Sequence, residues 1–161
     1  MRVLGALLAV ACFYIAGLMI AAEEGKKLTA AESLYSLCVY MSRRISSQRE
    51  PLRALFDNAS DEYLENIGFL PLLRSRSDTP GALWKKGIAL LSLTPAAAGE
   101  LAAYGETLGE IPLAEQERSN ADMTAYLREY RDALAGEIPA KKKCIRTVAL
   151  LCGLLAVIIM L

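Results

Sequence analysis

Residues 123–138 read MTAYLREYRDALAGEI, and their apolar side chains recur at steps of four, three, four and four residues. The residues on this seam are Met123, Leu127, Tyr130, Leu134 and Ile138. Such spacing places them on one face of an α-helix, where they can pack against other helices. No stretch of the chain shows the sustained apolar and polar alternation of a half-buried strand, so the sequence predicts an all-α fold.

The residues before this seam repeat the helical period in shorter runs. Thr29 and Glu32 form a capping-box pattern that predicts the start of a first helix. Pro51, Asp61 and Thr94 mark the expected starts of later helices. We therefore expect a bundle of about five to six helices over residues 28–140. The predicted buried face of the first helix consists of Leu34, Leu37, Cys38, Met41 and Ile45.

Pro112 precedes the last and longest predicted helix, which two residues interrupt near its end. Gly136 and Pro139 lie just before the lysines at 141–143, and Pro139 cannot donate to the carbonyl one turn back. We expect a joint in the helix at this point.

The two ends of the 161-residue chain are apolar. Residues 3–22 and 147–161 contain no charged side chain, and the first run has about the ~20 residues that a helix needs to cross a bilayer. The second run is shorter, but a bilayer can thin around it while flanking lysines reach the interface. A cleaved signal peptide is the alternative for the first run, which is longer than a secretory apolar region. We predict a transmembrane anchor over 1–27, a helical domain over 28–140, and a basic stretch with a second transmembrane helix over 141–161.

Basic residues flank both apolar runs on the side of the central domain. By the positive-inside rule they predict a two-span membrane protein with a cytoplasmic central domain. Contact with anionic lipid is a compatible second role for the same side chains. These membrane-flanking residues are Lys26, Lys27, Lys141, Lys142, Lys143 and Arg146.

The chain lacks the residues that several classes of enzyme and metal site require. The chain has no histidine, which excludes Ser-His-Asp and Cys-His catalysis, and its four cysteines lack metal-ligand spacing. No phosphate-binding glycine loop occurs. We expect no catalytic residue, no metal, no cofactor and no small-molecule substrate, although a membrane enzyme using carboxylates or a Ser-Lys pair stays open.

The central domain is acidic. Residues 28–140 carry sixteen acidic and eleven basic side chains, a balance that discourages nucleic-acid binding. Acidic residues are densest over 100–117, where a solvated helix face is the simpler interpretation and docking to a basic partner is the functional one.

Residues 101–109, LAAYGETLG, resemble the L-x-x-F-G-x-x-L-G signature of the stage III sporulation protein AB family. The order of the other parts agrees, with LGALL at 4–8, ALW at 82–84, Gln116, and CGLL at 152–155. Arg43 and Arg44 depart from the family pattern, as do the helix-breaking Gly136 and Pro139. The structural signature consists of Trp84, Leu101, Tyr104, Gly105, Leu108 and Gly109.

The resemblance implies a helical domain similar to the F domain of type II secretion systems. It also implies a non-enzymatic platform subunit of the channel between mother cell and forespore, in the mother-cell membrane that surrounds the forespore. The implied partners are ring-forming membrane proteins of that complex and a secretion-type ATPase. A small membrane-permeabilising protein of the holin type and a platform of another envelope machine are the alternatives. Polar residues around the signature, expected to be exposed, form a candidate partner surface: Glu106, Glu110, Gln116 and Arg118.

Overall fold

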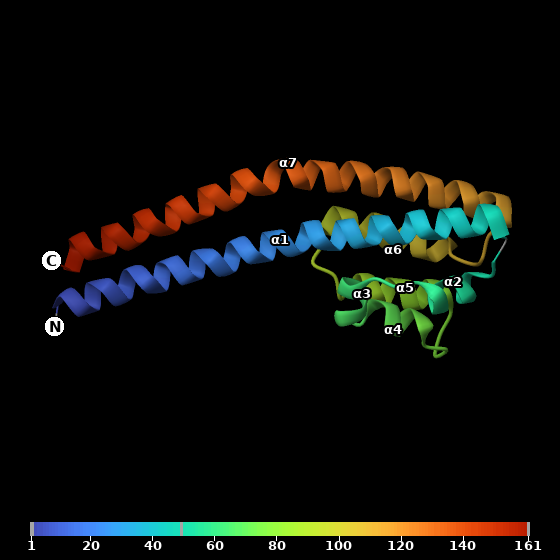
Figure 1. The fold of residues 1–161 in the computed structure, drawn as a ribbon, viewed down its shortest axis with the longest axis horizontal. Coiled ribbons are helices and arrows are strands. Elements are labelled where there is room, and N and C mark those ends of the chain that lie inside the picture. Colours follow the sequence, from blue (N-terminus) through green and yellow to red (C-terminus); the bar gives the residue numbers. More distant parts are fainter. Residues whose placement is uncertain (1, 49, 161) are drawn as a thin grey trace. The chain divides into compact units, whose positions relative to one another are not determined.

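The computed structural model describes the backbone of residues 2–48 and 50–160 and the side chains of 10–47 and 50–158. Parts of both apolar ends, including the LGALL stretch at 4–8, therefore have side chains outside the described residues. No strand occurs in the described backbone, which confirms the all-α prediction (Figure 1). The helices are α1 (Arg2–Gln48), α2 (Leu52–Asn58), α3 (Glu62–Asn66), α4 (Phe69–Arg74), α5 (Pro80–Ile88), α6 (Pro95–Thr107) and α7 (Leu113–Met160).

The helices divide between two compact units. The central unit comprises residues 29–133, and the terminal unit combines residues 1–28 with residues 134–161. Helices α1 and α7 are each divided between the units, with one part in the terminal unit and the other part in the central unit.

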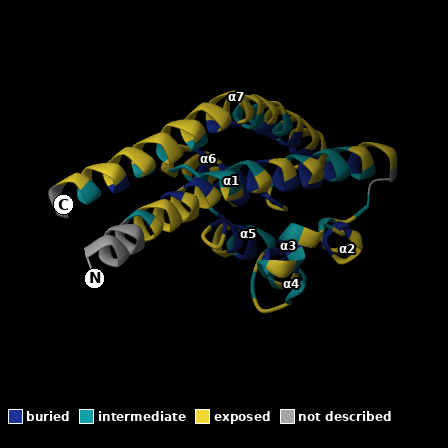
Figure 2. Ribbon diagram, turned by 60° about the vertical axis from the view of Figure 1, so that its left-hand side comes forward, coloured by how far each residue is buried: buried dark blue, intermediate teal, exposed yellow. Residues whose placement is uncertain are grey.

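The central unit has a core that all seven helices share. Its portions of α1 and α7 run antiparallel, because Asn120 bonds to Cys38 while Arg131 lies over the ring of Tyr35. The shorter helices α2 to α6 complete the core, and Figure 2 shows buried residues along α1, α2 and α5. The predicted inner face of the first helix is confirmed, since Leu34, Leu37, Cys38, Met41 and Ile45 are all buried.

Helix starts in the central unit follow their capping residues. The side chains of Thr79 and Thr94 accept hydrogen bonds from the backbone N–H groups of Ala82 and Ala97, at the starts of α5 and α6. Asp61 caps α3 in the same way.

The helix predicted from Asp61 onward is divided into α3 and α4. Gly68, with a φ of +86°, lies between the two pieces and directly precedes α4. Pro71 lies in the first turn of α4, where its missing N–H would have had no helical partner.

One predicted helix boundary is wrong. Thr29 and Glu32 lie inside α1, because the apolar helix before them continues without a break, supported by ion pairs from Glu23 to Lys26 and from Glu24 to Lys27. A capping box acts only where the chain enters a helix from outside.

Helix α7 is continuous through Gly136 and Pro139, so neither residue ends the helix. The joint expected at these residues stays a prediction, because Pro139 lacks one backbone donor and its ring crowds the carbonyl one turn back. An ion pair of 2.9 Å between Glu137 and Lys141 bridges the same turn.

The terminal unit is an antiparallel pair of helix ends. A Cβ built on Gly17 would lie 2.6 Å from the Cβ of Ala149, and one on Gly153 would lie 3.3 Å from the Cα of Val10. Gly17, Ala21 and Gly153 are buried, whereas the exposed large apolar side chains of this unit lie at residues 13–20 and 148–158. Leu134 and Ile138, at the start of this unit's part of α7, are buried. Across the described part of the chain, no helix combines the length and the apolar character that spanning a membrane requires.

Candidate interaction site

A close crossing of α5 and α6 shapes the centre of the bundle. A Cβ on Gly81 would lie 2.3 Å from the carbonyl oxygen of Gly105, and a Cβ on Gly105 would lie 2.6 Å from Cδ1 of Trp84. Any larger residue at either position would push the two helices apart. Glycine at both places therefore allows the backbones to meet.

Trp84 fills the space that this crossing leaves. Its indole N–H donates to the carbonyl of Leu101 at 2.9 Å, and its ring makes edge-on contacts with Phe69 and Tyr104 at 5.4 and 5.5 Å between centroids. Trp84 and Leu101 are fully buried, and Leu108 is nearly so. Most of the sequence signature thus forms the interior of the domain rather than its surface.

Asn120 is a buried polar centre that the sequence analysis missed. Its Oδ1 accepts from the hydroxyl of Tyr104 at 2.7 Å, and its Nδ2 donates to the carbonyl of Cys38 and to Oγ of Ser42. Since the side chain is fully buried, these bonds satisfy groups that would otherwise be costly, and they join α1, α6 and α7. The signal was available, because Gln116 and Asn120 extend the Met123 seam backward by steps of four and three residues.

Burial keeps two groups beside this centre uncharged. Burial raises the pKa of the Cys38 thiol to about 12, and it raises the pKa of Tyr104 as well. Neither group serves as a nucleophile or a base near neutral pH. In the described residues, no three His, Cys, Asp or Glu side chains are grouped so that they could hold a metal ion.

Gln116 is buried, which corrects its predicted place on an exposed partner surface. Only 6% of its surface is accessible, and its Oε1 accepts from the backbone N–H of Gly109 at 3.1 Å. Gly109 has a φ of +80°, a left-handed conformation that favours glycine at this turn after α6. Gln116 therefore fixes the turn that ends the signature.

The other three residues of the predicted partner surface are exposed but lie in different places. Arg118 lines a groove of about 440 Å³ between α6 and α7, which Glu106 and Glu110 do not line. Glu106 instead pairs with Lys85 at 2.8 Å, and this contact lowers the pKa of its carboxyl group.

The groove between α6 and α7, which we call the acidic groove, carries three carboxylates against one guanidinium. Glu100 lies on its α6 side, and Glu115, Asp122 and Arg118 lie on its α7 side. Tyr104, Met123 and Tyr126 line it as well, so charged groups surround an aromatic and apolar lining. Such an arrangement suits a basic partner segment that also has apolar side chains.

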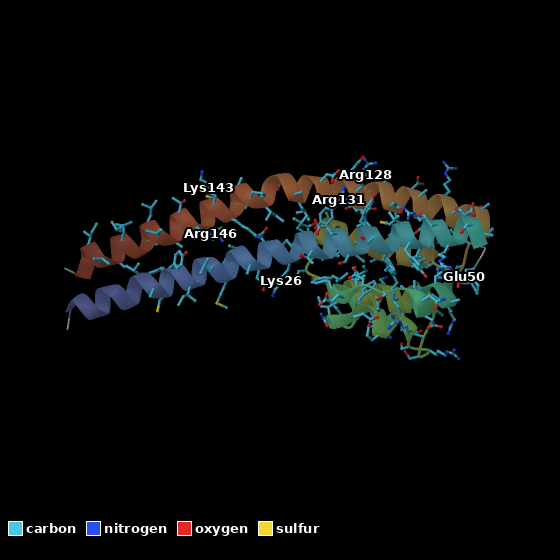
Figure 3. The ribbon with its side chains drawn as sticks, in the orientation of Figure 1. Lys26, Glu50, Arg128, Arg131, Lys143 and Arg146 are labelled. Atoms are coloured by element: carbon cyan, nitrogen blue, oxygen red, sulfur yellow. The ribbon has the colours of Figure 1, made fainter. Side chains whose placement is uncertain are left out.

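The basic residues predicted to flank the membrane all belong to the terminal unit. Lys26, Lys27 and Lys141 are engaged by acidic neighbours on their own helices. Lys143 and Arg146 are exposed on α7 (Figure 3). The structure thus brings basic groups from both ends of the chain into one unit.

In comparisons with known proteins, the chain matches the model of one protein family. The model of the family described as stage III sporulation protein AB matches residues 2–161. The search of curated proteins and the search of solved structures gave no significant match.

Proposed function

The chain belongs to the stage III sporulation protein AB family, and on that premise we propose that it is a non-enzymatic membrane platform of the channel between mother cell and forespore. Its role lies in stage III of sporulation. The partners in this proposal are ring-forming membrane proteins and a secretion-type ATPase, which would supply the energy.

The acidic groove carries the platform proposal. Three carboxylates around an apolar lining, on a central domain with an excess of acidic side chains, favour docking of a basic segment. The lining of the groove is held by a contact with the interior, because Tyr104 lines the groove and its hydroxyl donates a hydrogen bond to Asn120. A preformed surface of this kind loses little freedom when a partner binds.

The terminal unit supports a place at the membrane. Its outward apolar side chains include Met19 at 66% exposure and Ile158 at 64%. Water disfavours such a surface, whereas lipid chains accept it. Lys143 and Arg146 would then lie at the headgroups, with the central domain in the cytoplasm.

An in-frame deletion in the native host tests the function. We expect heat-resistant spores to be lost and engulfed forespores to arrest, with both restored by the wild-type chain. Normal spore numbers after deletion would contradict a role in the channel.

Charge reversal in the groove tests the docking surface. In the double variant Glu115→Lys/Asp122→Lys, recovery of the secretion-type ATPase with the chain from detergent-solubilised membranes should fall about tenfold or more, as expected for lost charge complementarity. Glu62→Lys, an exposed position on α3, is the matched control and should leave recovery unchanged. Equal recovery with all three chains would remove the groove from the proposed contact.

A further inference from the structure

A second cavity of the central unit lies apart from the acidic groove. It has a volume of about 260 Å³ and lies where the end of α1, the start of α2 and the start of α7 come together. Ile45, Leu52, Ile111 and Leu113 supply an apolar lining, and Glu50 and Gln116 supply polar groups. The volume is below the ~300–1,000 Å³ that is typical of small-molecule sites, so it is better matched to side chains of a protein.

Gln116 presents an unused hydrogen-bond donor in this cavity. Its Oε1 must face Gly109, because the backbone N–H there is a donor, and this leaves the Nε2 amide as the other end. That Nε2 atom is buried and has no hydrogen-bond partner among the described residues. A buried donor without a partner is costly, so its presence in a cavity points to an acceptor that arrives from outside.

Glu50 presents the complementary acceptor. Its Oε1 is engaged by Asn58 at 3.2 Å, whereas its Oε2 is buried without a hydrogen-bond partner among the described residues. Arg44 forms an ion pair with Oε2 at 3.7 Å, a distance longer than a hydrogen bond, so Oε2 can still accept one. One donor and one acceptor in the same cavity match the C=O and N–H groups of a peptide backbone.

We infer that this cavity binds an extended segment of a partner protein, whose apolar side chain enters beside Leu113. The main chain of that segment accepts from Nε2 of Gln116 and donates to Oε2 of Glu50. Leu113 is 43% exposed at the edge, where it can cover the inserted side chain. The inference rests on the proposed function, in which the chain holds other proteins.

Site-specific photocrosslinking in the native host tests the inference. A benzophenone amino acid replaces Leu113 in the full-length chain, and the crosslinked peptides from sporulating cells are sequenced by mass spectrometry. Leu90 is the matched control position, because it is similarly exposed, at 47%, and does not line the cavity. We expect crosslinks from position 113, and not from position 90, to one segment of another protein that contains an apolar residue.

Two further variants, each combined with the probe at position 113, test the polar pair. Gln116→Glu keeps an acceptor for Gly109 and removes the donor, and Glu50→Gln keeps an acceptor for Asn58 while placing a donor where Oε2 was. Each should lower the crosslink yield about tenfold. If Gln116→Glu lowers the helix content of the chain, the result of Glu50→Gln is used to judge the inference, because Glu50 is the more exposed of the two residues.

Three results would overturn the inference: crosslinks only to lipid or to a second copy of the chain, no crosslink at position 113, or yields that neither variant changes. Spore counts after deletion separate this test from that of the proposed function. Normal spores together with a specific crosslink would refute the channel role and retain the docking cavity. Lost spores without a crosslink would refute the docking cavity and retain the channel role.

Discussion

The core of the central unit and the apolar ends of the terminal unit differ in where their large side chains lie. In the central unit the large residues Trp84, Phe69 and Leu101 are completely buried. In the terminal unit the buried positions include Gly17 and Gly153, and large residues such as Leu154 point outward. Small residues between helices and large apolar residues outside are the pattern of helix packing in lipid, whereas the reverse pattern suits water.

The largest expected effect is in the interior of the central unit. Trp84→Ala removes both aromatic contacts and the bond to Leu101, and should lower the free energy of unfolding by about 3–5 kcal/mol. Urea unfolding of the full chain in detergent, followed by far-ultraviolet circular dichroism, measures the loss. Trp84→Phe keeps an aromatic ring and should cost less. An alanine variant as stable as the wild type would mean that the crossing of α5 and α6 does not depend on this side chain.

The next effect concerns the outward face of the terminal unit. Leu154→Lys places a charge on a surface that we assign to lipid, at a cost of ~2.5–3.5 kcal/mol for a central position in a span. We expect a smaller fraction of the chain to stay in the membrane after alkaline carbonate extraction. Leu90→Lys, an exposed position in the central unit, is the control and should be retained like the wild type. Equal retention of Leu154→Lys would contradict the assignment to lipid.

The third effect is a pH dependence of the free energy of unfolding that comes from the buried thiol of Cys38. The pKa of Cys38 is about 12 in the folded chain and near its ordinary value of 9 when unfolded. The stabilising contribution of the neutral thiol is complete below pH 9 and is lost as the pH rises toward 12, by about 1.4 kcal/mol per pH unit. The free energy of unfolding should therefore fall more steeply with pH in the wild type than in Cys38→Ala. Parallel curves for the two chains would show that Cys38 is accessible to water.

The smallest effect on stability is expected at the exposed acidic residues. Reversing Glu106 and Glu110 to lysine removes the ion pair with Lys85, yet both side chains lie in water. The thermal unfolding midpoint should not change measurably, while recovery of partner proteins should weaken less than in Glu115→Lys/Asp122→Lys, because neither residue lines the acidic groove. Unchanged recovery would exclude these two residues from the contact.

The helical period predicted much of the central unit. The seam from Met123 onward, the inner face of the first helix and the helix start at Thr94 depend on local spacing and side-chain chemistry. Trp84 is buried as well, in a stretch whose neighbours Leu83 and Ile88 are apolar. These features are confirmed by burial and by hydrogen bonds.

The missed features depend on contacts between residues far apart in the sequence. Asn120 meets Cys38 and Ser42 across 82 and 78 residues, and nothing in its immediate sequence identifies these partners. Gln116 was placed on the surface because its type is usually exposed, although its position on the seam pointed inward. The boundary at Thr29 is wrong because the turns before it keep the helix intact despite a local start signal.

Labelling of the full chain in native membranes with a lipid-soluble photoactivated reagent tests most directly that the two units are built for different solvents. Peptide mass spectrometry should place the label on residues 13–20 and 148–158, where large apolar side chains are exposed. Leu90 and Leu113, also exposed but in the central unit, should stay unlabelled. Label on these two leucines at the level of the terminal unit, or no label on the terminal unit, would contradict the account.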